Sequence, residues 1–520
     1  MKHSHGRAWC ECFDVMADCP TSVSGQLVFA IVYNKKTWRS YMVFSSAIFL
    51  FAFLPIVILM HTFIPSIRIR NALLIVASLV FYSFGEPVYV LLLLLSIIVN
   101  YVAGRILAVH KGKRGKIILA IVVVINLLLL VVFKYAGYLL ECVNMLPFVS
   151  LPVPHIRMPI GISFFTFQAL SYVIDTYKSE AAKKSSFWEV CLYICLFPQL
   201  VAGPIVKYSS IKDAISDRKV TIEKLSEGIG YFIIGLSKKI LIANVCATAA
   251  DKMFALELSE VNILVAWVGA ISYLFQIYFD FSGYSDMAVG IGKMLGFEFP
   301  QNFNYPYIAG SVRDFWKRWH ISLTSWFREY LYFPLGGNRK GKIRTIFNRF
   351  FVFVCTGIWH GANFTFFLWG IYHGLLTAIE TFVENEKKLR KKDDSTNKGK
   401  AKIQSFFMHV YTLLAVTIGF VIFRSDSVMQ GLYFIKNMFS FTNVGNIGDS
   451  LGLTYALMVM SPLFIITLVI AFIASTPVCK LIYKNRCTQL LQKVVLLLMY
   501  VLCIFEIAAG SYNPFIYFRF

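Results

Sequence analysis

A histidine lies in the most apolar part of the chain. The 30 residues between Arg349 and Glu380 include no Asp, Glu, Lys or Arg, yet they carry His360 within TGIWHGANF. An ionisable side chain at membrane depth is costly and usually serves a function. Imidazole titrates near neutral pH, so His360 is a candidate general base. A histidine on an apolar helix can also be a hydrogen-bonded tie between helices, and the local sequence leaves both interpretations open.

A second histidine, His320, lies in the segment RDFWKRWHISLTSWFREYL at 313–331. On a helical wheel the large apolar residues of this segment share one face, and the basic residues occupy a neighbouring face with His320 at the boundary. We expect one amphipathic helix that lies along the membrane surface. Its cations would either anchor it to lipid or hold an anionic cytosolic ligand. The candidate donor-binding residues are Arg313, Lys317, Arg318 and Arg328.

Acidic and amide groups form a third set of candidates. Asp280 and Asp286 follow an apolar run, but a spacing of six residues does not place them on one face of an ideal helix, so we do not expect a carboxylate pair. Gly283 and Gly290 in the same block indicate close helix packing or irregular turns. We take Asp286 and Asn363 as candidate cavity-lining residues.

The elements that position these residues are membrane helices. Of the 520 residues, 58% are hydrophobic and only 15% are charged. Apolar runs recur along the chain without strand-like alternation, which predicts an all-α polytopic fold of roughly 10 to 12 transmembrane helices, with re-entrant and interfacial helices. As one helix, the 30-residue run around His360 would be about 45 Å long, against about 30 Å of hydrocarbon. Both of its flanks are basic, so we expect a broken or re-entrant path, bent near Gly357, Gly361, Ala362 and Asn363.

Basic residues gather in short loops, and this explains the net charge of +22. The segment 105–116 holds five basic residues and no acid, and 313–349 holds nine basic residues and two acids. The positive-inside rule places such loops in the cytoplasm, where anionic lipid headgroups help to hold them. The highly charged stretch 384–402 is expected to be a solvated cytoplasmic loop. We expect no nucleic-acid partner, because no aromatic–basic pattern for one stands apart from the spans.

The rest of the chain is expected to form one membrane domain at 42–520. Residues 1–41 are polar and lack the apolar core of a signal peptide. Met42 is therefore a plausible start, and 1–41 would be an extension outside the native chain. The FPQLVAGP stretch at 197–204 is expected either to line a cavity or to end a helix at the interface. The cysteine and histidine spacing matches no standard zinc site, so no metal is expected.

Several long motifs stand out along the chain: GYSDMAVGIGKMLGFEFPQNFNYPY, RDFWKRWHISLTSWFREYLYFPLGGNR and GIWHGANFTFFLWGIYHG, and also SFFTFQALSYVIDTY, FPQLVAGPIVKY, MVFSSAIFLFAFLP and the terminal FIYFRF. Together they resemble the motifs of the membrane-bound O-acyltransferase family, in particular its bacterial alginate and polysaccharide O-acetylation branch. The resemblance runs from Met42 to Phe520. The position of Asn363 in WHGANF departs from many relatives, which have a small residue there, and this bears on the local shape of the cavity.

The resemblance implies roles for particular residues. His360 of the WHG motif would be catalytic and His320 of the RWHIS motif would be the second essential histidine. The donor would be a cytosolic acyl thioester, most simply acetyl-CoA as a co-substrate, with no bound cofactor. The acceptor would be an extracytoplasmic polysaccharide, reached through an SGNH-type serine acetyltransferase partner. The location would be the inner (cytoplasmic) membrane of a bacterial cell. Alternatives are D-alanyl or other acyl transfer to a cell-wall polymer, a transporter of a lipid-linked substrate, and a scaffold for a surface synthase.

Overall fold

The computed structural model describes residues 42–146, 148–154, 156–179, 185–390, 398–440, 451–478 and 489–510. Side chains are not described at 384–390, 398–401, 451 and 489. The expected extension 1–41, residues 391–397 of the charged loop and the terminal motif at 515–520 lie outside the described residues.

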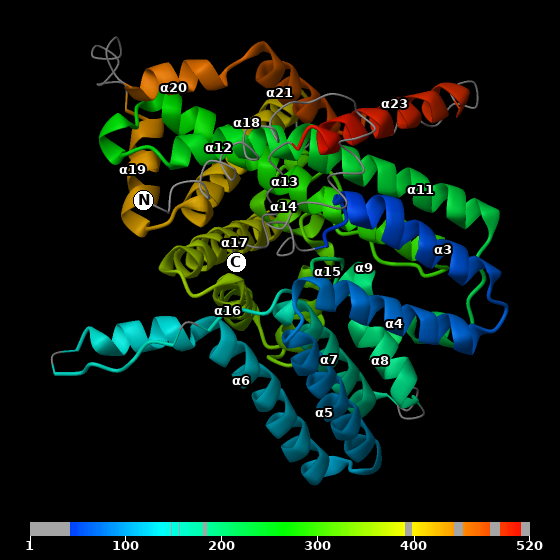
Figure 1. The fold of residues 1–520 in the computed structure, drawn as a ribbon. Coiled ribbons are helices and arrows are strands. Elements are labelled where there is room, and N and C mark those ends of the chain that lie inside the picture. The colour runs from blue at the N-terminus through cyan, green and yellow to red at the C-terminus, as the bar shows by residue number, and fades with distance from the viewer. Residues whose placement is uncertain are drawn as a thin grey trace, which may run out of the picture.

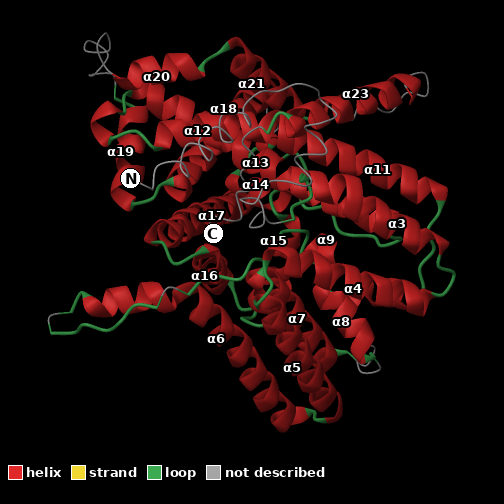
Figure 2. Cartoon of the chain, viewed as in Figure 1, coloured by secondary structure: helices red, strands yellow, loops and turns green. Residues whose placement is uncertain are grey.

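Every regular element in these described ranges is a helix, and Figure 2 shows helices joined by loops throughout. The first half of the chain forms η2 (Phe49–Phe53), α3 (Leu54–Phe63), α4 (Ile67–Gly85), α5 (Tyr89–Val109), α6 (Gly112–Asn144), α7 (Ile162–Lys178), α8 (Phe187–Cys195), α9 (Phe197–Leu200), α10 (Tyr208–Ser216), α11 (Ile222–Ser237), η4 (Lys238–Ala243), α12 (Asn244–Phe254) and η5 (Leu258–Glu260). The second half forms α13 (Ile263–Met294), η6 (Pro306–Ile308), α14 (Val312–Arg318), α15 (Ile321–Phe327), η7 (Arg328–Tyr332), α16 (Lys342–His360), α17 (Phe364–Arg390), α18 (Lys398–Arg424), α19 (Val428–Met438), α20 (Leu451–Val459), α21 (Pro462–Ala474) and α23 (Gln489–Ala508).

Eight helices in the described part of the chain are long and apolar enough to cross a membrane, or nine if the pair α20 and α21, bent by 66°, counts as one span. This confirms the all-α polytopic prediction. The count falls below 10 to 12 because several apolar runs form shorter pieces. The run at 190–206, for example, forms the end of α8, the four-residue α9 and irregular chain.

Packing divides most of the helices into two groups. Helices α4 to α8 pack on one another, and α12, α13, α18 and α19 form a second set of neighbours. Figure 1 shows α14 to α17 between these two groups. The buried hydrophobic residues form two clusters, and α13 contributes its first part to one cluster and its last part to the other. The elements that carry His320 and His360 therefore lie where the two groups meet.

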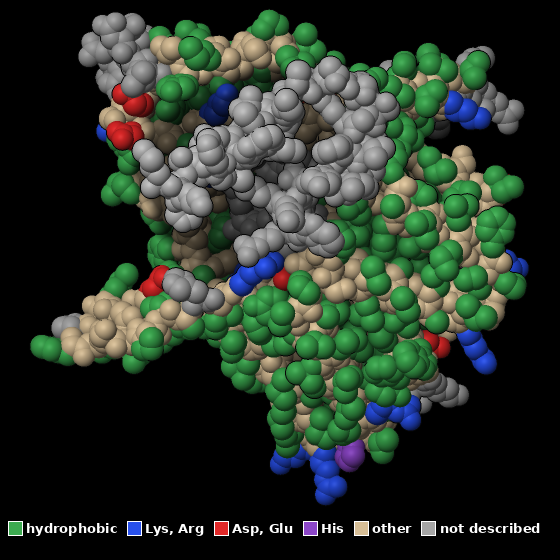
Figure 3. All heavy atoms as spheres, viewed as in Figure 1, with side chains coloured by type: hydrophobic (Ala, Val, Ile, Leu, Met, Phe, Trp, Pro, Cys, Tyr) green, Lys and Arg blue, Asp and Glu red, His purple; other side chains and the backbone are tan. Residues whose placement is uncertain are grey.

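The helices of the first group, α4 to α8, carry an apolar surface suited to contact with lipid. Figure 3 shows hydrophobic side chains over most of the face around α4 to α7, with Lys and Arg at the projecting ends. Leu91 of α5 is 66% exposed and Val124 of α6 is 52% exposed. Exposed aliphatic side chains on long helices are what a hydrocarbon environment requires.

The centre of the second group is α13, a 32-residue helix that is buried along most of its length. It packs tightly against α11. A Cβ on Gly228 would lie 2.6 Å from the carbonyl oxygen of Gly290, and a Cβ on Gly235 would lie 2.5 Å from that of Gly283. The expected close packing at Gly283 and Gly290 is therefore observed, and its partners are the glycines of α11.

The segment 313–331 is not one surface helix, and that expectation was wrong. Helix α14 ends at Arg318, and His320 takes a left-handed backbone conformation with φ of 44° before α15 begins. The N–H of Ile321 donates to the carbonyl of Asn302 at 2.9 Å, and the N–H of Asn304 donates to the carbonyl of Arg318 at 2.9 Å. These backbone hydrogen bonds to 302–304 replace the helical ones. The apolar face faces protein instead of lipid: its buried members are Phe315, Trp316, Trp319, Leu323, Trp326, Phe327 and Tyr330.

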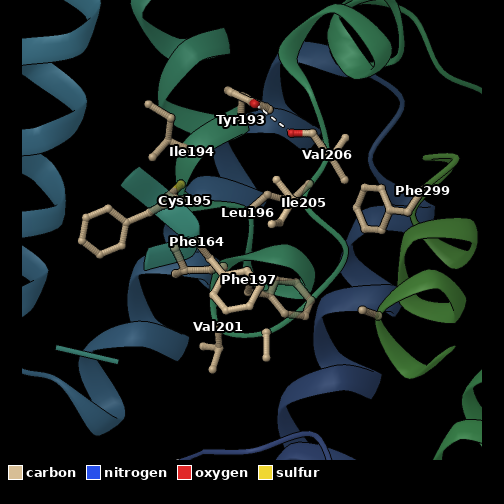
Figure 4. Close-up of a cluster of buried hydrophobic side chains, with 14 of the residues drawn as sticks. Phe164, Tyr193, Ile194, Cys195, Leu196, Phe197, Val201, Ile205, Val206 and Phe299 are labelled. Atoms are coloured by element: carbon tan, nitrogen blue, oxygen red, sulfur yellow. Dashed lines mark hydrogen bonds between the residues drawn. The ribbon is translucent and has the colours of Figure 1, made fainter. Parts of the chain in front are cut away.

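The FPQLVAGP stretch is irregular and lies inside the protein. Figure 4 shows its side chains within a cluster of buried hydrophobic residues, where the Tyr193 hydroxyl donates to the carbonyl of Val206 at 2.8 Å. Farther along, the N–H of Ile205 donates to Ser322 Oγ at 3.0 Å. Buried partners thus satisfy the irregular backbone, as membrane depth demands. Through Ser322 this segment also supports the start of α15.

Candidate active site

His360 is the last residue of α16, at the tip of a helical hairpin. Residues 361–363 form the turn, and α17 begins at Phe364. The two helices approach closely, because a Cβ on Gly357 would lie 2.5 Å from the carbonyl oxygen of Phe366 and one on Gly370 would lie 2.7 Å from that of Phe353. The break expected near Gly361, Ala362 and Asn363 is therefore present, whereas Gly357 lies inside α16 and not at the break.

Aromatic rings from three helices surround the His360 imidazole. Its ring centroid lies 4.9 Å from that of Trp359, 5.2 Å from that of Trp369 in α17 and 4.9 Å from that of Phe423 in α18. The side chain is partly buried. Such a setting holds the ring in one orientation and excludes most water, which strengthens electrostatic interactions at the site. Lys134 and His320 are both close enough to interact electrostatically with His360.

His320 is held by one amide oxygen. Its Nδ1 lies 3.1 Å from Asn302 Oδ1, which also accepts hydrogen bonds from the Ser322 N–H at 3.2 Å and the Ser322 hydroxyl at 2.9 Å. A carboxamide oxygen only accepts, so Nδ1 carries the proton and Nε2 is the basic atom of the neutral ring. His320 lies outside the candidate membrane spans, and burial lowers its pKa to about 3, so this ring is neutral at physiological pH.

The structure brings the two predicted histidines close to one tryptophan. The Trp359 ring centroid lies 6.4 Å from that of His320 and 4.9 Å from that of His360. Trp359 in turn stacks on Phe167 of α7 at 5.5 Å. Residues 40 positions apart in the sequence thus meet at one place between the two helix groups.

The four candidate donor-binding cations lie on α14 and η7, but not on one continuous face. Lys317 and Arg328 are exposed. Arg318 forms an ion pair with Asp314 at 3.0 Å, and its guanidinium also donates to the carbonyl of Asn304 at 3.4 Å. Arg313 is partly buried, and its backbone N–H donates to the Glu380 carboxylate at 2.9 Å. The broken helix therefore divides the cations into a group at α14 and a single residue beyond α15.

The two candidate cavity-lining residues each have a defined partner. Asp286 forms an ion pair with Lys238 at 2.6 Å. Asn363 accepts a hydrogen bond from the Thr365 N–H at 3.0 Å and donates to the carbonyl of Asp426 at 3.0 Å. Asn363 thus caps the start of α17 and ties the His360 turn to the chain after α18.

Sequence reasoning missed several polar residues around the site. Lys239 forms a buried ion pair with Asp280 at 2.9 Å, next to the pair of Lys238 with Asp286. Consecutive lysines within an apolar run are a signal for such partners, because hydrocarbon tolerates charge only when it is paired. Lys134, a lysine in the apolar sequence of α6, carried the same signal, whereas Asn302 gave none. Among the described residues, no group of three or more His, Cys, Asp or Glu is placed to hold a metal ion.

Comparison with known proteins identifies the class. The family model described as the membrane-bound O-acyltransferase family matches residues 76–386. The probable alginate O-acetylase of Pseudomonas putida is 36% identical over 509 residues, which covers 92% of this chain and 100% of that protein. The peptidoglycan O-acetyltransferase of Helicobacter pylori is 31% identical over 528 residues, covering 92% and 98%. The teichoic acid D-alanyltransferase of Bacillus subtilis is 30% identical over 266 residues, covering 46% and 65%.

The chain therefore belongs to the membrane-bound O-acyltransferase family. It is a multi-pass membrane protein and an O-acyltransferase.

Proposed function

We propose that this O-acyltransferase moves an acetyl group from cytosolic acetyl-CoA across the membrane for O-acetylation of an extracytoplasmic polysaccharide. Two relatives that match 92% of the chain are described as acetylating alginate and peptidoglycan. D-alanyl transfer is the second candidate, and the relative that favours it matches 46% of the chain. Acetyl transfer is therefore the better supported reaction.

His360 is the general base in this proposal. The observation that supports it is the placement of both His360 and His320 next to Trp359, between the two helix groups. The imidazole takes the proton of an acceptor hydroxyl while that oxygen attacks the thioester carbonyl. The tetrahedral intermediate then expels the thiolate as the C–S bond breaks, and the imidazolium returns the proton to sulfur. Base catalysis of this kind contributes about 10²- to 10⁴-fold.

His320 is the second essential histidine, and it orients the donor or a neighbouring side chain. Asn302 fixes its tautomer, so Nε2 can accept a hydrogen bond. The phosphates of the donor would contact Arg313, Lys317, Arg318 and Arg328 at the cytosolic side. Asp286 and Asn363 would shape the cavity wall through their fixed contacts.

The pathway around the enzyme follows from the topology of the reaction. The donor is cytosolic and the polymer is outside, so the acetyl group needs an acceptor on the far side. We propose an SGNH-type serine acetyltransferase as that partner and the bacterial inner membrane as the location. No bound cofactor is needed, since the thioester supplies an activated acyl group.

The test supplies radiolabelled acetyl-CoA to inverted membrane vesicles and measures the rate at which the labelled acetyl group is incorporated into the polysaccharide. His360→Ala should lower the rate by about 10²- to 10⁴-fold. His320→Ala should also abolish most activity, whereas His110→Ala, at an exposed position after α5, should not. Full activity in His360→Ala would reject the assigned base and favour a scaffold. Transport of an unmodified substrate with no release of coenzyme A would favour a transporter.

A further inference from the structure

Helix α6 reaches the His360 turn at two successive residues. The Lys134 ammonium donates to the carbonyl of Trp359 at 2.5 Å, and the Tyr135 hydroxyl donates to the carbonyl of Gly361 at 3.2 Å. The two carbonyls belong to the residues immediately before and after His360. These contacts join positions more than 220 apart in the sequence. The backbone that carries His360 is thus held on both sides by one helix.

The end of α16 needs such partners. The last carbonyl oxygens of a helix receive no hydrogen bond from an N–H group of the same helix, and in hydrocarbon no water is present to donate one. Gly361 continues in an extended conformation, with φ of 174°, so it does not form the left-handed cap that closes many helices. A cation at this end also interacts favourably with the helix dipole. The Lys134 ammonium therefore takes the place of a left-handed cap at the C-terminal end of α16, next to His360.

Lys134 is unusual within its own helix. The buried residues of α6 are Gly115, Val122, Asn126 and Leu130, and most of the rest of the helix presents apolar side chains outward. A lysine in such a helix is costly, and its position toward the protein indicates a function. Its Nζ lies 3.5 Å from Ser163 Oγ and 5.6 Å from the centroid of the Trp359 ring. The ammonium therefore lies close to both the backbone before His360 and the Trp359 ring, which neighbours both histidines.

We propose that Lys134 and Tyr135 are positioning residues for acyl transfer, because they fix the backbone on both sides of His360 and thereby aim its imidazole. This inference rests on the proposed role of His360. Lys134 also limits the movement of Trp359, so the distance between the two histidines depends on it. The pair acts through His360 and Trp359, and the chemistry at the acyl carbon remains with His360.

The experiment compares Lys134→Met, Lys134→Arg and Tyr135→Phe in the inverted vesicles, with acetyl-CoA varied. Misplacing a reacting group by about 1 Å can cost about 100-fold, so Lys134→Met should lower kcat by about 10- to 100-fold. The KM for acetyl-CoA should stay within about twofold, since the donor-binding cations are unchanged. Lys134→Arg retains a charged donor and should restore kcat to within about threefold of the parent. Tyr135→Phe removes one neutral hydrogen bond and should have a smaller effect on kcat.

The matched controls lie on the same helix. Lys113→Met removes an exposed lysine and Tyr138→Phe removes an exposed hydroxyl, and both should leave kcat unchanged. Rates are expressed per folded protein, measured by size-exclusion chromatography of detergent extracts. Parental kcat per folded molecule in Lys134→Met would overturn the proposal. So would equal losses in Lys134→Met and Lys134→Arg, because a conservative donor would then give no rescue.

His360→Ala in the same vesicles separates this inference from the proposed function. Activity in His360→Ala would reject the base itself. An inactive His360→Ala together with a fully active Lys134→Met would reject only the positioning role.

Discussion

At the scale of single residues, one oxygen atom decides the state of His320. Asn302 Oδ1 accepts from His320 Nδ1 and from both donors of Ser322, and Asn302 is 2% exposed. Because three donors converge on this atom, its removal would leave several buried groups without a partner. The tautomer of His320 would then no longer be fixed.

Asn302→Ala should therefore reduce both stability and activity. An unsatisfied buried donor costs about 1–3 kcal/mol, so the thermal unfolding midpoint in detergent should fall measurably. The rate of acetyl incorporation should fall by more than the loss of folded protein explains, because the His320 proton is no longer held on Nδ1 and Nε2 is no longer always the acceptor atom. Asn304→Ala is the control, because the Asn304 side chain is exposed and its described contacts are made by its backbone. Wild-type rates in Asn302→Ala would show that the tautomer of His320 has no bearing on transfer.

Sequence reasoning singled out the two histidines as candidates but not the residues that the structure places in contact with them. His320 and His360 stand out because an ionisable group in an apolar setting is costly in free energy. Asn302 does not stand out in this way, and although Lys134 is an ionisable residue in an apolar helix, the sequence does not show which residues it contacts. Asn302 is a polar residue in a loop, and Lys134 meets Trp359 only through tertiary packing. A single sequence holds no signal for a contact that the fold creates between distant positions.

At the scale of elements, glycine contacts set the distances between helices. Gly228 of α11 faces α13, where a Cβ would lie 2.6 Å from the carbonyl oxygen of Gly290 and 3.0 Å from the Met294 nitrogen. Backbone atoms cannot rotate away, so the two helices would have to separate. Gly230 lies two residues farther along α11, and a Cβ there would meet nothing within 4 Å.

Gly228→Ala and Gly230→Ala form a matched pair. Overpacking at Gly228 should destabilise the protein by about 1–3 kcal/mol, which thermal unfolding in detergent would detect. Gly230→Ala should be neutral or stabilising by about 0.5–1 kcal/mol, because alanine favours a helix over glycine. Equal unfolding midpoints for the two variants would contradict close packing of α11 on α13.

The sequence predicted some helix breaks and missed another, for physical reasons. Glycines and a length beyond the hydrocarbon thickness indicated the break after His360. The break at His320 had no such sign, since the apolar periodicity of 313–331 continues across it. Two backbone hydrogen bonds cause that break: the N–H of Ile321 donates to the carbonyl of Asn302, and the N–H of Asn304 donates to the carbonyl of Arg318. They come from a separate segment, so periodicity alone favours the unbroken helix.

At the scale of the whole molecule, we expect the hairpin of α16 and α17 to carry His360 deep into the membrane from one side. The 19 residues of α16 span about 28 Å along the helix axis, close to the roughly 30 Å of hydrocarbon. The chain before α16 is basic, as is the stretch 384–402 after the apolar part of α17. Both ends should therefore face the cytoplasm, and the hairpin should enter and leave on the same side.

Cysteine labelling tests this topology in a chain whose 11 cysteines are replaced by alanine. Lys340→Cys, before α16, and Lys402→Cys, near the start of α18, should react with an impermeant maleimide only after the membrane is permeabilised. Lys113→Cys, at the start of α6, should behave in the same way, because its loop is basic. Ser150→Cys, beyond the far end of this 33-residue helix, should react in intact cells. If Lys340→Cys and Lys402→Cys react from opposite sides, the intervening chain crosses the membrane an odd number of times. That result would reject the hairpin topology, because α16 and α17 would not then enter and leave the membrane on the same side.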